Sequence, residues 1–111
     1  MAAPASHVVK VHKESEFDAQ LAGAGDKLVI VDFFATWCGP CLRIAPFLDG
    51  LSVEYKDVLF VKVDVDELED LAAKYGVSAM PTFQAFKHGK RVDSLVGASP
   101  DGLRALVTKN K

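Results

Sequence analysis

Residues 31–41 read Val-Asp-Phe-Phe-Ala-Thr-Trp-Cys-Gly-Pro-Cys and place a pair of cysteines directly after a run of apolar residues. That run extends from Lys27 to Ala35 and is nearly continuous, which predicts a central strand covered on both faces. Beyond the cysteines, apolar residues recur at helical spacing, at Ile44, Phe47, Leu48, Leu51 and Tyr55. The sequence therefore predicts that Cys38 and Cys41 lie where a buried strand passes into a helix.

The first part of the chain alternates between strand-like and helix-like blocks. Val8–Val11 is predicted to form a short edge strand, and the helix after it is expected to have Ser15 as its N-cap. Residues 58–65 predict another buried strand, and residues 68–75 carry apolar side chains at helical spacing. Parallel strands joined by helical crossovers are the expected arrangement of these blocks.

The last part of the chain follows a different pattern. Two strand-like runs, Thr82–Lys87 and Arg91–Val96, are separated by a short turn in which His88 and Gly89 fit a hairpin loop. A final helix is predicted to begin at residues 99–101, where a serine hydroxyl precedes a proline and an acid. The whole order, β-α-β-α-β-α-β-β-α, predicts an α/β fold with a central mixed five-stranded sheet flanked by four helices.

Length and composition limit the classes of function. The 111 residues suit a single domain spanning residues 1–111, in which we expect residues 1–6 to form a flexible extension. A net charge of -2 without a basic stripe argues against nucleic-acid or membrane binding. The chain has no apolar stretch long enough for a membrane span and no pattern of a secretory signal, so we expect a cytoplasmic protein.

The spacing of the two cysteines favours redox chemistry. Linking Cys38 to Cys41 closes a very small loop, which would stabilise the fold little. A thiol at a helix N-terminus is biased towards the thiolate, the nucleophile in thiol–disulfide exchange. We therefore predict that Cys38 attacks a substrate disulfide and that Cys41, expected to be more buried, resolves the mixed disulfide. Two alternatives are half of a zinc site, for which further ligands are missing, and an inert structural disulfide.

The two residues between the cysteines also bear on the chemistry. Pro40 is suited to begin the helix and stiffens the loop, and Gly39 leaves room for a substrate backbone near Cys38. Neither residue carries a charge or an imidazole that would further stabilise the thiolate. Their absence favours a reductant over an oxidant.

Several segments together resemble the thioredoxin family from about Val8 onward. They are residues 31–41, Ala45-Pro46, residues 63–66 (Val-Asp-Val-Asp) and residues 77–83 (Val-Ser-Ala-Met-Pro-Thr-Phe). The resemblance implies the thioredoxin fold and a cis peptide bond before Pro81 that faces the cysteines. It also implies that the backbone of Met80 pairs with a bound substrate chain. The alternative for Met80 and Pro81 is an ordinary strand start.

The resemblance further implies an apolar docking rim around Cys38. Its expected members are Trp37, Gly39, Pro40, Met80, Pro81 and Gly97. The chain departs from the family pattern at Thr36, Phe34 and Leu42; the last stands where a lysine is common and removes a positive charge near the site. This departure affects the expected redox poise and partner preference, and leaves the expected reaction unchanged.

Asp32 and Lys62 are charged residues within predicted strands. An acid in the apolar run of residues 27–35 is costly to bury, so its pKa should be raised, and we expect it to accept the proton of Cys41 during resolution. The resemblance implies the same role and places Lys62 beside Asp32 as a charge partner. The alternatives are a solvated acid at a strand end and a solvent-facing lysine.

The predicted function is protein-disulfide reduction in cell redox homeostasis. The resemblance implies no bound cofactor, with electrons supplied by NADPH through thioredoxin reductase, and the missing further ligands predict no metal. It implies peroxiredoxins, methionine sulfoxide reductase and ribonucleotide reductase as recipients, and we expect a monomer. Two alternatives stay open: a redox-regulated protein-binding module, and a disulfide oxidase or isomerase domain.

Overall fold

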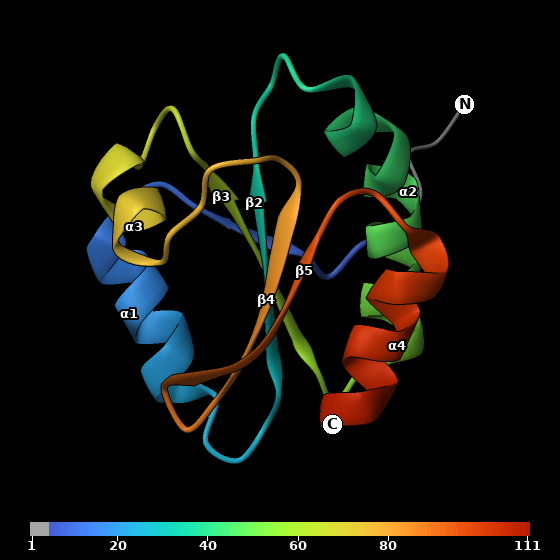
Figure 1. Ribbon diagram of the computed structural model, residues 1–111. Helices are drawn as coiled ribbons and strands as arrows, with labels where there is room; N and C mark the ends of the chain where they lie inside the picture. Colours follow the sequence, from blue (N-terminus) through green and yellow to red (C-terminus); the bar gives the residue numbers. More distant parts are fainter. Residues whose placement is uncertain (1–4) are drawn as a thin grey trace.

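Five strands form one mixed sheet in the order β1-β3-β2-β4-β5 (Figure 1). The computed structural model describes residues 5–111, and residues 1–4 of the predicted extension lie outside them. The strands are β1 (Val9–Val11), β2 (Val29–Phe34), β3 (Leu59–Asp64), β4 (Thr82–Lys87) and β5 (Lys90–Val96). Strand β3 pairs in parallel with β1 and β2, whereas β4 pairs antiparallel with β2 and β5. The predicted mixed five-stranded sheet is confirmed.

Four helices cover the two faces of this sheet. They are α1 (Glu14–Gly23), α2 (Gly39–Glu54), α3 (Glu69–Lys74) and α4 (Pro100–Asn110). Helices α1 and α3 lie on one face, and α2 and α4 lie on the other (Figure 1). All six residues of β2 are buried, which confirms the prediction of a strand covered on both faces. Among the helices within residues 5–111, none is both long and apolar enough to cross a membrane.

The alternation of side chains along β2 supplies two separate cores. Val31 and Phe33 pack with residues of α1 and α3, such as Phe17. Ile30 packs on the opposite face with residues of α2 and α4, such as Leu48. Because strand side chains alternate between faces, Asp32 must point to the same side as Ile30. The carboxyl group is therefore directed towards the layer that contains α2.

Local sequence signals account for the turn and for one helix start. His88 and Gly89 both have positive φ, 52° and 76°, as the predicted two-residue hairpin requires. The hydroxyl of Ser99 accepts a hydrogen bond from the Gly102 N–H, which confirms the predicted cap of α4.

The predicted cap of the first helix is wrong. Lys13 is the N-cap of α1 and makes no side-chain capping bond, and Ser15 lies inside the helix. The Glu16 carboxylate accepts a hydrogen bond from the His12 N–H at 2.7 Å, just before the helix. This glutamate holds the entering backbone, and the Lys13 carbonyl accepts the N–H groups of Glu16 and Phe17, so the helix starts before Ser15.

The chain that enters β1 is attached to α2. The hydroxyl of Ser6 donates a 2.7 Å hydrogen bond to Oδ1 of Asp49, and the His7 N–H donates to the hydroxyl of Ser52. Ser52 is buried, and its hydroxyl in turn donates to the Asp49 carbonyl. Residues 6 and 7 are thus bonded to the C-terminal half of α2.

Candidate active site

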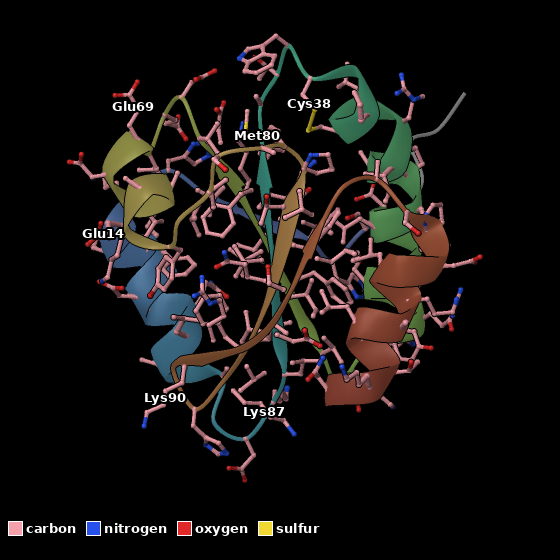
Figure 2. The ribbon with its side chains drawn as sticks, in the orientation of Figure 1. Glu14, Cys38, Glu69, Met80, Lys87 and Lys90 are labelled. Carbon is pink, nitrogen blue, oxygen red and sulfur yellow. A yellow bond between two sulfur atoms is a disulfide. The ribbon has the colours of Figure 1, made fainter. Side chains whose placement is uncertain are left out.

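The two cysteines lie at one edge of the sheet, where β2 ends and α2 begins (Figure 2). Cys38 is the N-cap of α2, and Pro40 occupies the first turn of that helix, as predicted. Cys38 and Cys41 are joined by a disulfide, with their Cα atoms 5.3 Å apart. The predicted junction between a buried strand and a helix therefore carries the cysteine pair.

The expected difference in burial between the two cysteines is not seen. Cys38 and Cys41 are each 5% exposed. In the disulfide form both sulfur atoms belong to one apolar cluster with Phe34 and Ala35, against which Met80 packs. The bond fixes the two side chains together, so burial does not distinguish an attacking cysteine from a resolving one in this state.

Hydrogen bonding does distinguish the cysteines. The Cys41 N–H donates to Sγ of Cys38 at 3.2 Å. An N–H directed at this sulfur, together with the positive end of the α2 dipole, stabilises negative charge there once the disulfide is reduced. Sγ of Cys38 also lies 3.6 Å from the Met80 carbonyl oxygen, a contact that becomes a hydrogen bond only when the sulfur carries a proton.

Met80, Pro81 and Gly97 meet beside the disulfide, although they are distant from it in the sequence. The Met80–Pro81 peptide bond is cis, as the family resemblance implied. The Gly97 N–H donates to the Pro81 carbonyl at 2.9 Å, and Gly97 has a φ of 108°, a conformation suited to glycine. These contacts hold the backbone around Pro81 from the end of β5.

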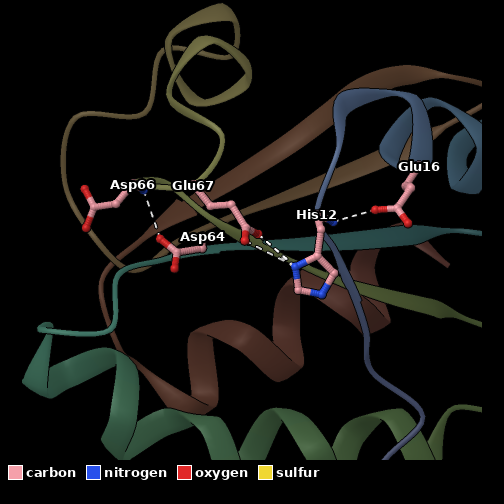
Figure 3. A network of polar contacts seen from close by, with 5 residues as sticks. All are labelled: His12, Glu16, Asp64, Asp66 and Glu67. Atoms are coloured by element: carbon pink, nitrogen blue, oxygen red, sulfur yellow. Dashed lines mark hydrogen bonds and ion pairs between the residues drawn. The ribbon is translucent and has the colours of Figure 1, made fainter.

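Asp66 is a residue of this site that its residue type alone does not single out. The indole of Trp37, 68% exposed, donates a 2.8 Å hydrogen bond to Oδ2 of Asp66. Oδ1 of Asp64 accepts from the Asp66 N–H, which fixes the turn after β3 (Figure 3). A signal was available, because the carboxyl ends of the parallel strands β2 and β3 must lie at the same edge of the sheet.

A second polar contact braces the same region. Nδ1 of His12 lies 3.0 Å from Oε1 of Glu67, next to the turn that carries Asp66 (Figure 3). The same histidine donates its backbone N–H to Glu16 at the start of α1. The end of β1, the start of α1 and the turn after β3 are thereby linked beside the active-site edge.

Asp32 is buried, with 2% of its surface exposed. Burial raises the pKa of its carboxyl from 3.8 to about 7; the charge of Lys62 acts in the opposite direction, and that of Asp49 adds to the increase. Oδ1 of Asp32 has no hydrogen-bond partner among the described residues. The alternative of a solvated acid at a strand end is wrong, and the predicted direction of the pKa shift is confirmed.

Lys62 lies directly across from Asp32 in the β2–β3 register. Its ammonium is 4.7 Å from the centre of the Phe34 ring, and the ammonium of Lys10, its neighbour on β1, is 5.4 Å from the same ring. The ion pairs found within residues 5–111 do not include one between Lys62 and Asp32. Lys62 therefore acts on Asp32 through its field, without direct contact.

The described residues also bear on metal binding. No group of three or more His, Cys, Asp or Glu side chains within residues 5–111 is arranged to hold a metal ion. The disulfide between Cys38 and Cys41 is the reactive group that the described residues place at this edge of the sheet.

Comparison with known proteins agrees with this geometry. The family model Thioredoxin matches residues 8–109. Thioredoxin-2 of Saccharomyces cerevisiae is 48% identical over 103 residues, which are 93% of this chain and 98% of the yeast protein. The crystal structure of thioredoxin NaTrxh from Nicotiana alata superposes with a TM-score of 0.95 at 42% identity and covers 100% of this chain and 98% of its own.

A third similar structure comes from work on the thiol-resolving mechanism in yeast mitochondrial 1-Cys peroxiredoxin via glutathione and thioredoxin systems. It is 36% identical with a TM-score of 0.85, and the match covers 95% of this chain and 99% of that one. The relatives favour neither a binding module nor an oxidase or isomerase domain. The chain belongs to the thioredoxin family and is a protein-disulfide reductase that acts on disulfide-containing substrates.

Proposed function

We propose that Cys38 is the attacking thiol and Cys41 the resolving thiol. The Cys38 thiolate attacks one sulfur of a substrate disulfide, and the other substrate sulfur leaves as a thiolate. The Cys41 thiolate then attacks Sγ of Cys38 in the mixed disulfide, which releases the second substrate thiolate and forms the Cys38–Cys41 disulfide. The observation that supports this assignment is the position of Cys38 as the N-cap of α2, where it accepts the Cys41 N–H.

Asp32 is the proposed acceptor of the Cys41 proton. Its carboxyl faces the α2 layer, and a pKa of about 7 lets it take up and release a proton near neutral pH. Lys62 tunes that pKa from the neighbouring strand. The proton that leaves Cys41 thus has an acceptor inside the protein, either directly or through a water molecule.

Substrates dock on the rim around the disulfide. Trp37 presents an exposed ring on one side of Cys38, and Gly39 and Pro40 form the start of α2 on the other. The backbone at Met80 lies next to Sγ of Cys38 and is placed to pair with an extended substrate chain, while Gly97 holds Pro81. A substrate disulfide that pairs with Met80 would meet Cys38 directly.

The chain acts in the cytoplasm as a monomeric electron carrier in redox homeostasis. It receives electrons from NADPH through thioredoxin reductase. It delivers them to peroxiredoxins, methionine sulfoxide reductase and ribonucleotide reductase. The similar structure described in connection with a yeast peroxiredoxin supports the first of these recipients.

The experiment that tests this proposal is reduction of insulin disulfides, driven by dithiothreitol or by NADPH with thioredoxin reductase. The wild type should accelerate the reaction, and Cys38→Ser should abolish the acceleration. Cys41→Ser should instead accumulate a covalent complex with insulin that dithiothreitol releases. A complex formed by Cys38→Ser and not by Cys41→Ser would reverse the assigned roles, and an inactive wild type would reject the function.

A further inference from the structure

The segment that follows Cys41 places a cation over the active-site loop. A Cβ atom built on Gly39 would lie 3.2 Å from Nη1 of Arg43. Residues four apart on a helix share a face, so the arginine side chain turns back along the first turn of α2 onto the glycine. Leu42, which stands where the family commonly has lysine, is 63% exposed. Position 42 thus has no positive charge, but the guanidinium of the next residue, Arg43, lies against Gly39.

The guanidinium of Arg43 is available to a ligand. Within residues 5–111, Arg43 donates no side-chain hydrogen bond, and the ion pairs found do not include it. The side chain is exposed, and its five N–H donors form a planar fork that matches a carboxylate. A free guanidinium beside a reactive disulfide is therefore positioned to contact whatever chain approaches over Gly39.

The charge on the other side of Cys38 has the opposite sign. There the Trp37 indole is bound to Asp66, within a segment, residues 64–70, that contains five acids and no basic residue. Glu69 lies at this end of the molecule, whereas Lys87 and Lys90 lie at the far end (Figure 2). The edge that surrounds the disulfide therefore has a guanidinium beside Gly39 and a carboxylate bonded to Trp37.

We propose that Arg43 is a specificity-determining residue that binds an acidic side chain of the substrate on the Gly39 side of Cys38. The inference rests on the proposed docking of substrate chains around Cys38. A chain that crosses Gly39 meets no side chain from that residue and comes directly within reach of the guanidinium. A carboxylate there can accept two parallel N–H bonds, whereas a lysine would be repelled. If the substrate chain docked in the opposite direction, its acidic side chain would be repelled by the acids of residues 64–70 beside Trp37. The charges therefore also set the direction in which the chain docks.

The test compares matched peptide disulfides that differ at one position near the cysteine. That residue is Glu, Gln or Lys. Its position is varied over about three residues on either side of the peptide cysteine, because a long arginine side chain can reach that far. At one or more positions the wild type should reduce the Glu peptide with a kcat/KM about 3- to 10-fold above the Lys peptide at low salt, as expected for a partly exposed ion pair. Added salt should reduce this ratio.

The variants make the test specific to Arg43. Arg43→Glu should invert the Glu-to-Lys ratio at the same peptide positions, and Arg43→Lys should preserve its direction with a smaller value because lysine cannot bind in a bidentate manner. Lys90→Glu, the same charge reversal at the far end of the molecule, should leave the ratio as in the wild type. An unchanged Glu-to-Lys ratio in Arg43→Glu would overturn the inference. The Gln peptide, which has no charge at this position, reports the reductase activity separately. Failure of the wild type to reduce the Gln peptide would overturn both proposals.

Discussion

The indole nitrogen of Trp37 donates a 2.8 Å hydrogen bond to the carboxylate of Asp66, and this bond joins the loop after β2 to the turn after β3. The Asp66 backbone is itself held by Asp64, so the acceptor is fixed before the indole reaches it. A tryptophan that is 68% exposed would otherwise sample several rotamers. The orientation of the aromatic side chain beside Cys38 is therefore set by the neighbouring strand.

We expect Asp66→Ala to loosen Trp37 and weaken substrate docking. The indole loses its acceptor, and KM for a protein disulfide should rise by about 3-fold with a smaller change in kcat, since an exposed hydrogen bond contributes about 1 kcal/mol or less. Trp37 is the only tryptophan, so its fluorescence anisotropy reports the orientation of this side chain. Asp66→Asn retains an acceptor oxygen and serves as the control. Equal anisotropy in Asp66→Ala and the wild type would show that the bond does not restrain the ring.

Asp32 should make the stability of the oxidised protein fall as pH rises. Its carboxyl keeps a proton in the folded state up to a pKa of about 7, whereas the unfolded chain releases that proton near 3.8. Between these values the folded state binds more protons than the unfolded state, so the free energy of unfolding decreases with pH and levels off above the higher pKa. The burial of this charge costs on the order of 4 kcal/mol at the plateau.

Asp32→Asn removes this dependence while retaining the shape of the side chain. The variant should be more stable than the wild type at about pH 8 and gain much less at about pH 5, where the wild-type carboxyl is neutral in the fold. Urea unfolding midpoints of the two oxidised proteins at both pH values provide the measurement. The same variant should slow the release of substrate from the mixed disulfide, because Cys41 loses its proton acceptor. A stability difference that is equal at both pH values would contradict the buried-acid account.

Lys62 should lower the pKa of Asp32 from across the β2–β3 pair. Replacing it with methionine keeps the length and the apolar contact with Phe34 but removes the opposing charge, so the pKa of Asp32 should rise further. NMR titration of the Asp32 carboxyl carbon in the oxidised protein measures this directly. Lys10→Met is the matched control, because Lys10 faces the same ring and is not among the groups that shift the pKa of Asp32. A similar shift in both variants would point to a rearranged Phe34 environment in place of a charge effect.

Much of this fold could be predicted because its signals are local. The apolar run before Cys38, the His88-Gly89 turn and the Ser99 cap each determine backbone geometry within a few residues, and the structure confirms them. Ser15 failed as a helix cap because the helix starts before it, where the Lys13 carbonyl accepts the N–H groups of Glu16 and Phe17. Several neighbouring residues can begin a helix, and sequence spacing alone does not decide between them.

The active-site residues with a distinctive chemical type could be predicted from the sequence. The residues that join the site only through the fold were missed. The cysteine pair and the buried acid stand out by type and position. Asp66 is one acid among many until β3 brings it to Trp37, and Arg43 is one cation among many until α2 turns it over Gly39. The equal burial of Cys38 and Cys41 in the disulfide form comes from their packing in one apolar cluster with Phe34 and Ala35, which depends on the tertiary fold.

Gly97 should be required for its backbone conformation. Its φ of 108° is costly for any residue with a Cβ, although a Cβ there would meet no atom within 4 Å. Gly97→Ala should therefore destabilise the protein by about 1–3 kcal/mol through backbone strain alone, and any shift of the chain would also weaken the Gly97–Pro81 hydrogen bond. Gly50→Ala is the matched control, because Gly50 lies inside α2 with equally open space and no positive φ. That substitution should stabilise the helix by about 0.5–1 kcal/mol, so urea unfolding of the two variants should give midpoints on opposite sides of the wild type. Equal stability of Gly97→Ala and the wild type would contradict this prediction. It would mean that the backbone at the end of β5 can leave its positive φ and still keep its hydrogen bond to Pro81.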